Sequence, residues 1–207
     1  MSISITIILV AITVLVSFFA MSNRDLKYKM MFIPFSIHHQ KGQTYRFFSH
    51  LFVHADWMHL FFNMYVLYAF GEFVEKSLFM LKGDAIGSAH FLILYFGGGL
   101  FATLIPYARN KNNPNYLSLG ASGAVSAIVF ACIILGPELK MGLLFLPIMI
   151  PGYIFGLLYL AFEFFMDKRG NTGIAHDAHI GGAIFGILFI SLTEPLALQN
   201  FIHYIFN

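Results

Sequence analysis

A serine in a turn of small residues is the first feature with chemical potential: Gly120, Ala121, Ser122 and Gly123 follow one another. Small neighbours let a substrate carbonyl and the backbone amide approach a serine hydroxyl, as a nucleophile requires. The same composition also lets helices of membrane proteins pack closely. Taken alone, the motif therefore favours helix packing, and a catalytic interpretation needs a base elsewhere in the chain.

His179 is the candidate base, and it stands at the start of the run Ala178–Gly186. Gly182 and Gly186 follow it at i+3 and i+7, so the three residues share one helical face. A glycine face can lie tightly against a neighbouring helix and bring the imidazole within reach of the Ser122 hydroxyl. Without other motifs, a packing stripe that carries one satisfied histidine explains this run better than a catalytic base does.

His59 and Asn63 form a second polar pair, four residues apart and therefore on one face of a helix. Buried polar residues within membrane helices are costly and need a reason. The pair begins a predicted helix, as do Ser122 and His179. Helices that alternate in direction place the starts of the second, fourth and sixth on one side, so these four residues can meet.

The elements that must position these residues are membrane helices. Of 207 residues, 58% are hydrophobic and 11% are charged, which lies outside the range of soluble domains. About 20 apolar residues make one helical crossing, so the chain has room for six, and we expect one domain over residues 1–207. Long continuous apolar runs argue against a β-barrel. The predicted fold is an all-α, six-transmembrane-helix bundle.

The expected crossings follow from the apolar runs. They are Ile3–Ala20, Met58–Val74, Ala89–Pro106, Ala121–Leu135, Leu143–Phe165 and Ala178–Leu192. The first run is not expected to be a signal peptide, because no Lys or Arg precedes it and no small-residue cleavage site follows. The connection from Met21 to about Trp57 is rich in aromatics and histidine, which predicts a structured interfacial loop. Pro147 and Pro151 are expected to kink the fifth helix.

The stretch from Tyr45 to Lys76 changes the balance between packing and catalysis. It contains Tyr-Arg, spaced histidines at positions 50 and 54, His59-Leu-Phe-Phe-Asn63, and then Gly71 with Glu75. Together with Gly-Ala-Ser-Gly and Ala-His-Ile-Gly-Gly-Ala-Ile-Phe-Gly, in this order, it resembles the rhomboid family of intramembrane serine proteases, in its compact six-helix bacterial form. The resemblance extends to Gly186, and the joint occurrence is far more specific than any single motif.

The resemblance implies a role for each matching residue. Ser122 would be the nucleophile and His179 its base, with His59, Asn63 and the Ser122 amide as oxyanion donors. The remaining matches would be structural, organising the first loop and the second helix: Arg46, His50, His54 and Glu75. A dyad is chemically sufficient, because a base that takes the serine proton can return it to the leaving amine. No cofactor and no metal are expected.

Two positions depart from the family pattern. Tyr45 replaces the usual tryptophan before the arginine. Ser126 stands four residues after the nucleophile, where the family often has an aromatic ring that stacks on the catalytic histidine. The contact that orients His179 is therefore left open.

Other classes of function fit the sequence less well than a protease. A metalloprotease lacks its HExxH motif here, an aspartyl protease lacks the first glycine of GxGD before Gly83-Asp84, and the histidines of the first loop lack familiar companion ligands. A transporter or proton relay would use buried acids such as Glu75 and Glu163, but it needs neither serine motif, and no inverted repeat is visible. An inactive relative would lack Ser122 or His179.

The expected partners are transmembrane protein substrates and the lipid bilayer. A net charge of +2 without a dense basic run excludes a nucleic-acid partner, and the oligomeric state is left open. The resemblance implies a bacterial inner membrane, a cytoplasmic N-terminus and a site that opens outward. Lys and Arg counts favour the opposite orientation, with nine on the side of the first, third and fifth connections and three on the other.

Overall fold

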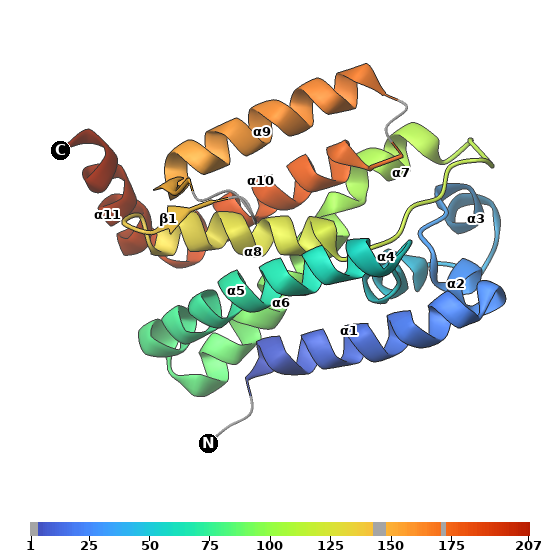
Figure 1. The fold of residues 1–207 in the computed structure, drawn as a ribbon, viewed down its shortest axis with the longest axis horizontal. Helices are drawn as coiled ribbons and strands as arrows, with labels where there is room; N and C mark the ends of the chain where they lie inside the picture. The colour runs from blue at the N-terminus through green and yellow to red at the C-terminus, as the bar shows by residue number, and fades with distance from the viewer. Residues whose placement is uncertain (1–3, 143–147, 171–172) are drawn as a thin grey trace.

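Helices make up most of the computed structural model, which describes residues 4–142, 148–170 and 173–207 (Figure 1). The helices before the turn at residues 120–122 are α1 (Ile5–Ser22), α2 (Arg24–Met30), α3 (Pro34–His39), α4 (Arg46–Ser49), the 3₁₀ turn η1 (His50–Phe52), α5 (Trp57–Lys82), α6 (Asp84–Ala102) and α7 (Leu104–Asn110). Those after it are α8 (Ser122–Leu135), α9 (Gly152–Arg169), α10 (His176–Thr193) and α11 (Pro195–Phe206).

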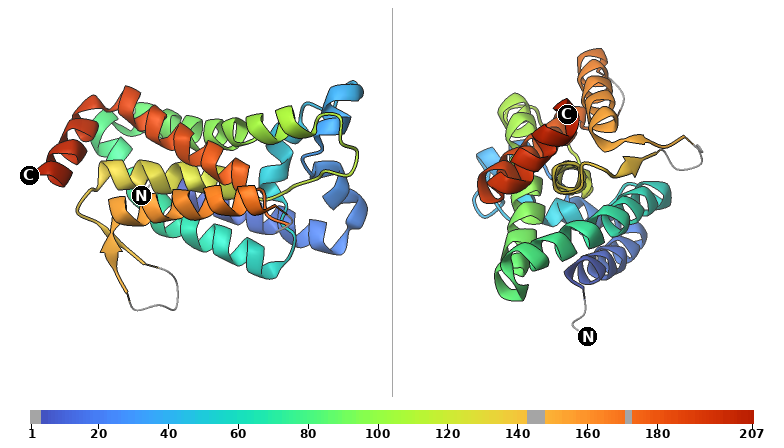
Figure 2. Two further views of the ribbon diagram at one scale, coloured as in Figure 1. Left: turned by 90° about the horizontal axis from the view of Figure 1, so that it is seen from above. Right: turned by 90° about the vertical axis from the view of Figure 1, so that its left-hand side faces the viewer.

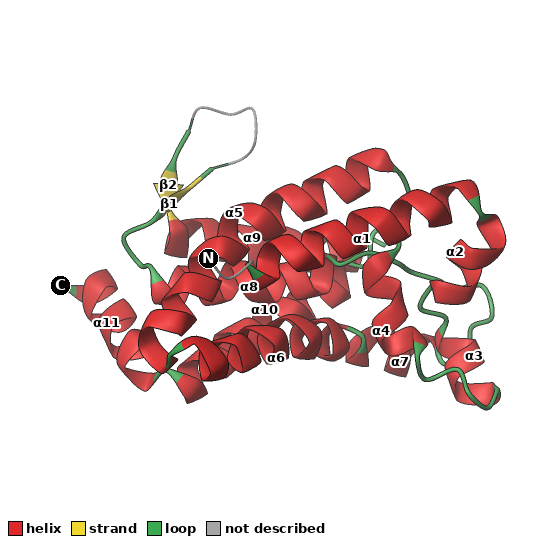
Figure 3. Ribbon diagram, turned by 90° about the horizontal axis from the view of Figure 1, so that it is seen from below, coloured by secondary structure: helices red, strands yellow, loops and turns green. Residues whose placement is uncertain are grey.

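A small antiparallel sheet lies between α8 and α9. It pairs β1 (Lys140–Met141) with β2 (Ile150–Pro151), with Lys140 opposite Pro151 and Met141 opposite Ile150. The sheet projects from the helical bundle (Figure 3). It delivers the chain to the start of α9.

Helix α8 is the centre of the bundle. Every residue from Gly123 to Ile134 is buried, and α5, α6 and α10 pack around it. Seen along its axis, α8 lies in the middle of the other helices (Figure 2). A helix that is apolar on all sides requires such a surrounding, and this burial fixes the helix whose first residue is Ser122.

Glycines on α10 allow its close contact with α8. A Cβ atom on Gly182 would overlap the carbonyl oxygen of Gly123, and one on Gly186 would overlap the carbonyl of Ala127. Only a residue without a side chain lets the two backbones approach so closely. The predicted packing of this glycine face on the helix that begins at Ser122 is confirmed.

The exterior of the bundle is apolar. Three helical stretches of the described chain are long and apolar enough to cross a membrane: Ile5–Ser22, Asp84–Asn110 and His176–Thr193. Large side chains such as Phe19, Leu157 and Leu192 are mostly exposed on the outside, where lipid replaces water as the solvent. The chain is an integral membrane protein.

A helix lies at each of the six expected positions, but several boundaries differ. α5 continues eight residues past Val74, where Glu72 and Lys76 form an i,i+4 ion pair. α9 begins at Gly152 rather than Leu143, because Pro151 is extended and precedes the helix. The expected kink at Pro151 is therefore wrong, while Pro147 and the expected start at Leu143 lie outside the described residues. The terminal helix α11 was not predicted.

The first connection is folded, as its composition predicts. Arg46 is buried and donates hydrogen bonds to the carbonyls of Tyr28 and Met31, both at 2.8 Å, and to the side chain of Gln43 at 2.7 Å. One guanidinium thus closes α2, the following turn and α4 into a compact unit. Its location at the membrane interface stays a prediction.

Glu75 joins α5 to the start of α1. Its carboxylate accepts hydrogen bonds from the hydroxyls of Ser4 and Thr6 and from the amides of Ile5 and Thr6, at 2.6 to 2.9 Å. Amides in the first turn of a helix have no acceptor within the helix, so a carboxylate there satisfies them. These contacts fit the structural role that the sequence suggests for Glu75.

Candidate active site

The folded first connection holds the segment that leads into Ser122. Phe32 and Ser118 exchange two backbone hydrogen bonds, at 2.9 and 3.0 Å. The Gly120 amide donates to the carbonyl of His50 at 3.0 Å, and the Ala121 amide donates to Nε2 of His54 at 3.4 Å. The segment before Ser122 is therefore anchored at successive points before α8 begins.

His54 holds this segment through its ring and His50 through its backbone carbonyl, and both rings are neutral. Because Nε2 of His54 accepts a hydrogen bond, its Nδ1 carries the proton and donates to Ser17 Oγ at 2.9 Å, and Ser17 in turn donates to the Phe52 carbonyl. Burial, reinforced by the nearby His59, lowers the pKa of His54 to about 3. Burial also lowers the pKa of His50 to about 4, although its Nδ1 donates to the Arg46 carbonyl.

Gly120 makes room for His59 beside the turn that leads into Ser122. Its φ of 115° is rarely adopted by residues with a side chain. A Cβ atom at this position would also lie 2.7 Å from Cε1 of His59. The glycine in the serine motif is therefore required twice, for the backbone turn and for the ring packed against it.

Ser122 and His179 meet at the starts of α8 and α10. His179 Nε2 lies 2.7 Å from Ser122 Oγ, and both side chains are only partly exposed. The starts of α5, α8 and α10 lie at the same end of the bundle (Figure 1). A histidine nitrogen at this distance from a serine hydroxyl is placed to accept its proton.

Glu163 of α9 supplies the orienting contact that the sequence leaves open. Its Oε1 lies 3.0 Å from Nδ1 of His179, and its Oε2 accepts a short hydrogen bond from Nδ1 of His176. An ionised carboxylate only accepts, so each imidazole holds a proton on Nδ1. Nε2 of His179 is then free to accept from Ser122.

Sequence reasoning missed this role of Glu163 and missed His176 entirely. The available signal was a carboxylate in an apolar helix with no Lys or Arg three or four residues away. Such a residue is by default a candidate for function.

Ser126 contributes a contact of a different kind from the aromatic ring it replaces. Its hydroxyl lies 2.8 Å from the hydroxyl of Tyr159 on α9. Tyr159 and Glu163 are four residues apart and lie on the same face of α9. Ser126 therefore links α8 to the helix face that carries Glu163.

His59 lies against Gly120, two residues before Ser122, and Asn63 lies one turn further along α5; both have donors to spare. Nδ1 of His59 accepts from the Ala55 amide at 3.4 Å, which leaves the proton on Nε2, the side packed against Gly120. Asn63 is buried and donates one amide hydrogen to the His59 carbonyl at 2.9 Å, so a second remains. The Ser122 amide is one of the first-turn donors without an intrahelical acceptor. Their joint service to an oxyanion stays a prediction.

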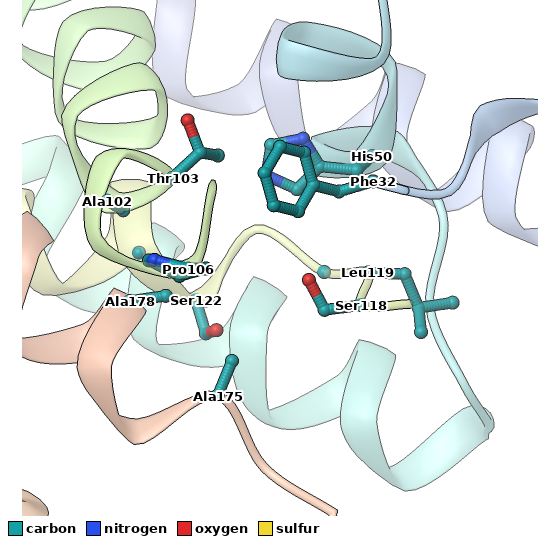
Figure 4. Close-up of a pocket in the computed structure, with 12 residues that line it drawn as sticks. Phe32, His50, Ala102, Thr103, Pro106, Ser118, Leu119, Ser122, Ala175 and Ala178 are labelled. Carbon is teal, nitrogen blue, oxygen red and sulfur yellow. The ribbon is translucent and has the colours of Figure 1, made fainter. Parts of the chain in front are cut away.

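A small cavity opens beside Ser122 (Figure 4). It lies between the start of α10, at Ala175 and Ala178, and the segment Ser118–Gly120. Thr103 and Pro106 close it from the side of α6 and α7. Ser122 is therefore one of the residues that line this cavity.

Glu163, His176 and His179 are also the set of described residues whose donor atoms, all within 4.8 Å, could hold a metal ion. Both carboxylate oxygens already engage the imidazoles, so hydrogen bonding accounts for their closeness. The expectation of no metal stays a prediction.

The fold and the site define an integral membrane protein with a serine and a histidine in hydrogen-bonding contact inside a helical bundle. Residues 41–195 match the family model described as Rhomboid domain. This match covers most of the chain, and the chain belongs to the rhomboid family.

Curated relatives agree with this assignment. The chain is 32% identical over 150 residues to presenilin-associated rhomboid-like protein A, mitochondrial, of Danio rerio, covering 70% of this chain and 36% of that protein. It is 30% identical over 154 residues to the Bos taurus presenilin-associated rhomboid-like protein, covering 72% and 38%. RHOMBOID-like protein 12, mitochondrial, of Arabidopsis thaliana is 29% identical over 153 residues, covering 70% and 45%. The aligned region spans less than half the length of these relatives.

Proposed function

We propose that the protein is an intramembrane serine endopeptidase that hydrolyses peptide bonds in or near transmembrane segments of membrane proteins. The observation that carries the proposal is the 2.7 Å contact between His179 Nε2 and Ser122 Oγ. Membership of the rhomboid family and the serine motif at a buried helix start support it.

In the proposed reaction, Ser122 Oγ attacks the substrate carbonyl while its proton moves to Nε2 of His179. The C–N bond then breaks, the leaving amine takes the proton from His179, and an acyl-enzyme remains. Water, deprotonated by His179, releases the acid and restores Ser122. Side chains of His59 and Asn63 and the Ser122 amide would stabilise the tetrahedral oxyanion.

Substrate would enter between α5 and α9 in a bundle of six crossings. Within the described ranges, α9 packs chiefly on α10, whereas α5 packs on α1, α6 and α8. The contact between α5 and α9 is thus the weaker seam. A substrate helix must unwind before cleavage, because an intact helix engages its carbonyls in intrahelical hydrogen bonds. Substrates with helix-breaking residues near the membrane boundary should be cleaved fastest.

The membrane and the orientation of the chain are part of the proposal. Family analogy suggested a bacterial inner membrane, a cytoplasmic N-terminus and an outward-facing site. The relatives compared give no support for a bacterial location, since their names place them in mitochondria. Protease protection of a C-terminal tag in the native membrane would decide the orientation.

Cleavage of a labelled single-span substrate by the purified full chain in detergent tests the proposal. Ser122→Ala and His179→Ala should each abolish cleavage. Ser77→Ala is the matched control, because Ser77 is also a helical serine but is buried away from this site and donates to the carbonyl of Phe73 in its own helix. Cleavage that survives either of the first two changes contradicts the proposal, and loss of cleavage in the control would show that serine removal acts through folding.

A further inference from the structure

Glu163 is an acid buried within an apolar helix. Its side chain is 6% exposed, and the residues beside it on α9 are Phe162 and Phe164. An ionised carboxylate at this depth is costly unless it is paired. Its ion-pair partners in the described part of the chain are His176 and His179. Pairing with the two imidazole rings therefore offsets the cost of burying the carboxylate, and the carboxylate in turn holds the two rings in place.

The two carboxylate oxygens are divided between the two rings. Oε1 faces Nδ1 of His179 and Oε2 faces Nδ1 of His176. His176 is buried, and its Nε2 has no hydrogen-bond partner among the described residues. A proton on that nitrogen would be buried and unsatisfied, so His176 keeps its proton on Nδ1 and donates it to Glu163.

The division fixes the form of His179 that can act as a base. With the proton held on Nδ1 by Glu163, Nε2 presents a lone pair to the Ser122 hydroxyl 2.7 Å away. When Ser122 transfers its proton, the imidazolium that forms lies beside the carboxylate rather than alone at membrane depth. Both effects act on the reaction step more than on substrate binding.

From this geometry we infer that Glu163 is a positioning residue that makes the site a relay of Ser122, His179 and Glu163, with His176 holding the second carboxylate oxygen. The inference rests on the proposed protease function. In this chain α9 then orients the ring of His179, which an aromatic side chain in place of Ser126 would otherwise do. Ser126 assists from a distance, through its bond to Tyr159 on the same face of α9.

Glu163→Gln separates the relay from simple packing. The amide has the shape of the acid, but it can accept from one imidazole and must donate to the other. Because His176 keeps its Nδ1 proton, it takes the amide oxygen, and the amide NH₂ faces His179. His179 is then driven to carry its proton on Nε2, which cannot accept from Ser122. Removing His176 frees the amide oxygen for His179.

The experiment measures kcat and KM for the purified full chain with a labelled single-span substrate, together with the melting temperature. Glu163→Ala and Glu163→Gln should each lower kcat about 100-fold, less than the loss of about 10⁴ for a soluble triad acid, and change KM less than about threefold. Adding His176→Ala to Glu163→Gln should restore kcat severalfold, whereas His176→Ala alone should lower it.

Glu75→Gln is the matched control for removing a buried acid. Glu75 is 3% exposed but bonds to the start of α1, away from the site, so its loss should lower the melting temperature and leave kcat per folded molecule within twofold. If Glu163→Ala does not fold, the isosteric Glu163→Gln and the double variant decide alone.

Two failures are distinguishable. Wild-type kcat in Glu163→Gln, or no gain on removing His176 from that variant, overturns the role of Glu163 while the inactivity of Ser122→Ala and His179→Ala leaves the protease standing. Cleavage by the latter two variants overturns the protease itself, and the inference with it.

Discussion

Gly182→Ala tests whether the close contact of α8 and α10 sets the catalytic geometry. The added Cβ would overlap the carbonyl oxygen of Gly123, the residue after Ser122. Ordinary carbon contacts need about 3.5 Å, so the helices must separate by at least about 1 Å at this point. Gly182 lies one turn from His179. Separating the two helices there should therefore lengthen the 2.7 Å distance between His179 Nε2 and Ser122 Oγ.

A displacement of about 1 Å can cost a reaction about 10²-fold, and overpacking a close contact costs about 1–3 kcal/mol of stability. We therefore expect Gly182→Ala to lower cleavage per folded molecule about 100-fold and to lower the melting temperature. Cleavage of the single-span substrate and thermal unfolding in detergent measure the two effects.

Two further glycines make the comparison internal. Gly186→Ala meets the Ala127 carbonyl in the same way but lies two turns from His179, so it should destabilise as much and slow cleavage less. Gly152→Ala is the control, because its Cβ would come no closer than 3.3 Å to the Leu139 carbonyl. Equal cleavage by Gly182→Ala and the control would show that the close contact of α8 and α10 does not set the catalytic geometry.

Three further results are expected. His59→Ala and Asn63→Ala should each lower kcat about 10²-fold without loss of folding if they serve the oxyanion, and unchanged kcat in both would remove them from the site. Folding lowers the pKa values of His50 and His54 from 6.5 to about 4 and about 3, so between these pH values the unfolded state binds more protons than the folded state. Stability is therefore full above pH 6.5 and is lost as pH falls towards 4, by on the order of 3 kcal/mol for His50, and a melting temperature that is flat from pH 7 to 4.5 would contradict this. Arg46→Gln should lower the melting temperature by loosening the first connection, with proteolysis between α2 and α4 as the readout, since it leaves two backbone carbonyls without their donor.

The parts of the site that the sequence reveals are those encoded within one helix or one turn. The interval from His179 to Gly182 and Gly186 predicts a close-packed face because helical periodicity fixes which residues align, and that face is found against α8. The serine motif likewise predicts a turn, and Gly120 provides it. The roles of Ser122, His179, His59 and Asn63 in a reaction stay predictions.

The orienting acid could not be assigned because its contact depends on how two helices are joined. Glu163 and His179 are sixteen residues apart, on α9 and α10, and no periodicity relates them. The start of α9 was misplaced for a similar reason. The apolar run continues through β2 into the helix, and hydrophobicity alone does not distinguish an extended proline segment from a helical one.

Labelling with a fluorophosphonate probe tests the central claim most directly, because the probe needs an activated serine and no knowledge of the substrate. The purified chain is treated with the probe in detergent, and the modified residue is identified by peptide mass spectrometry. Modification is expected at Ser122, is lost in His179→Ala and is strongly slowed in Glu163→Gln. Modification at another serine, or of Ser122 at the same rate in His179→Ala, would contradict the proposed dyad of Ser122 and His179.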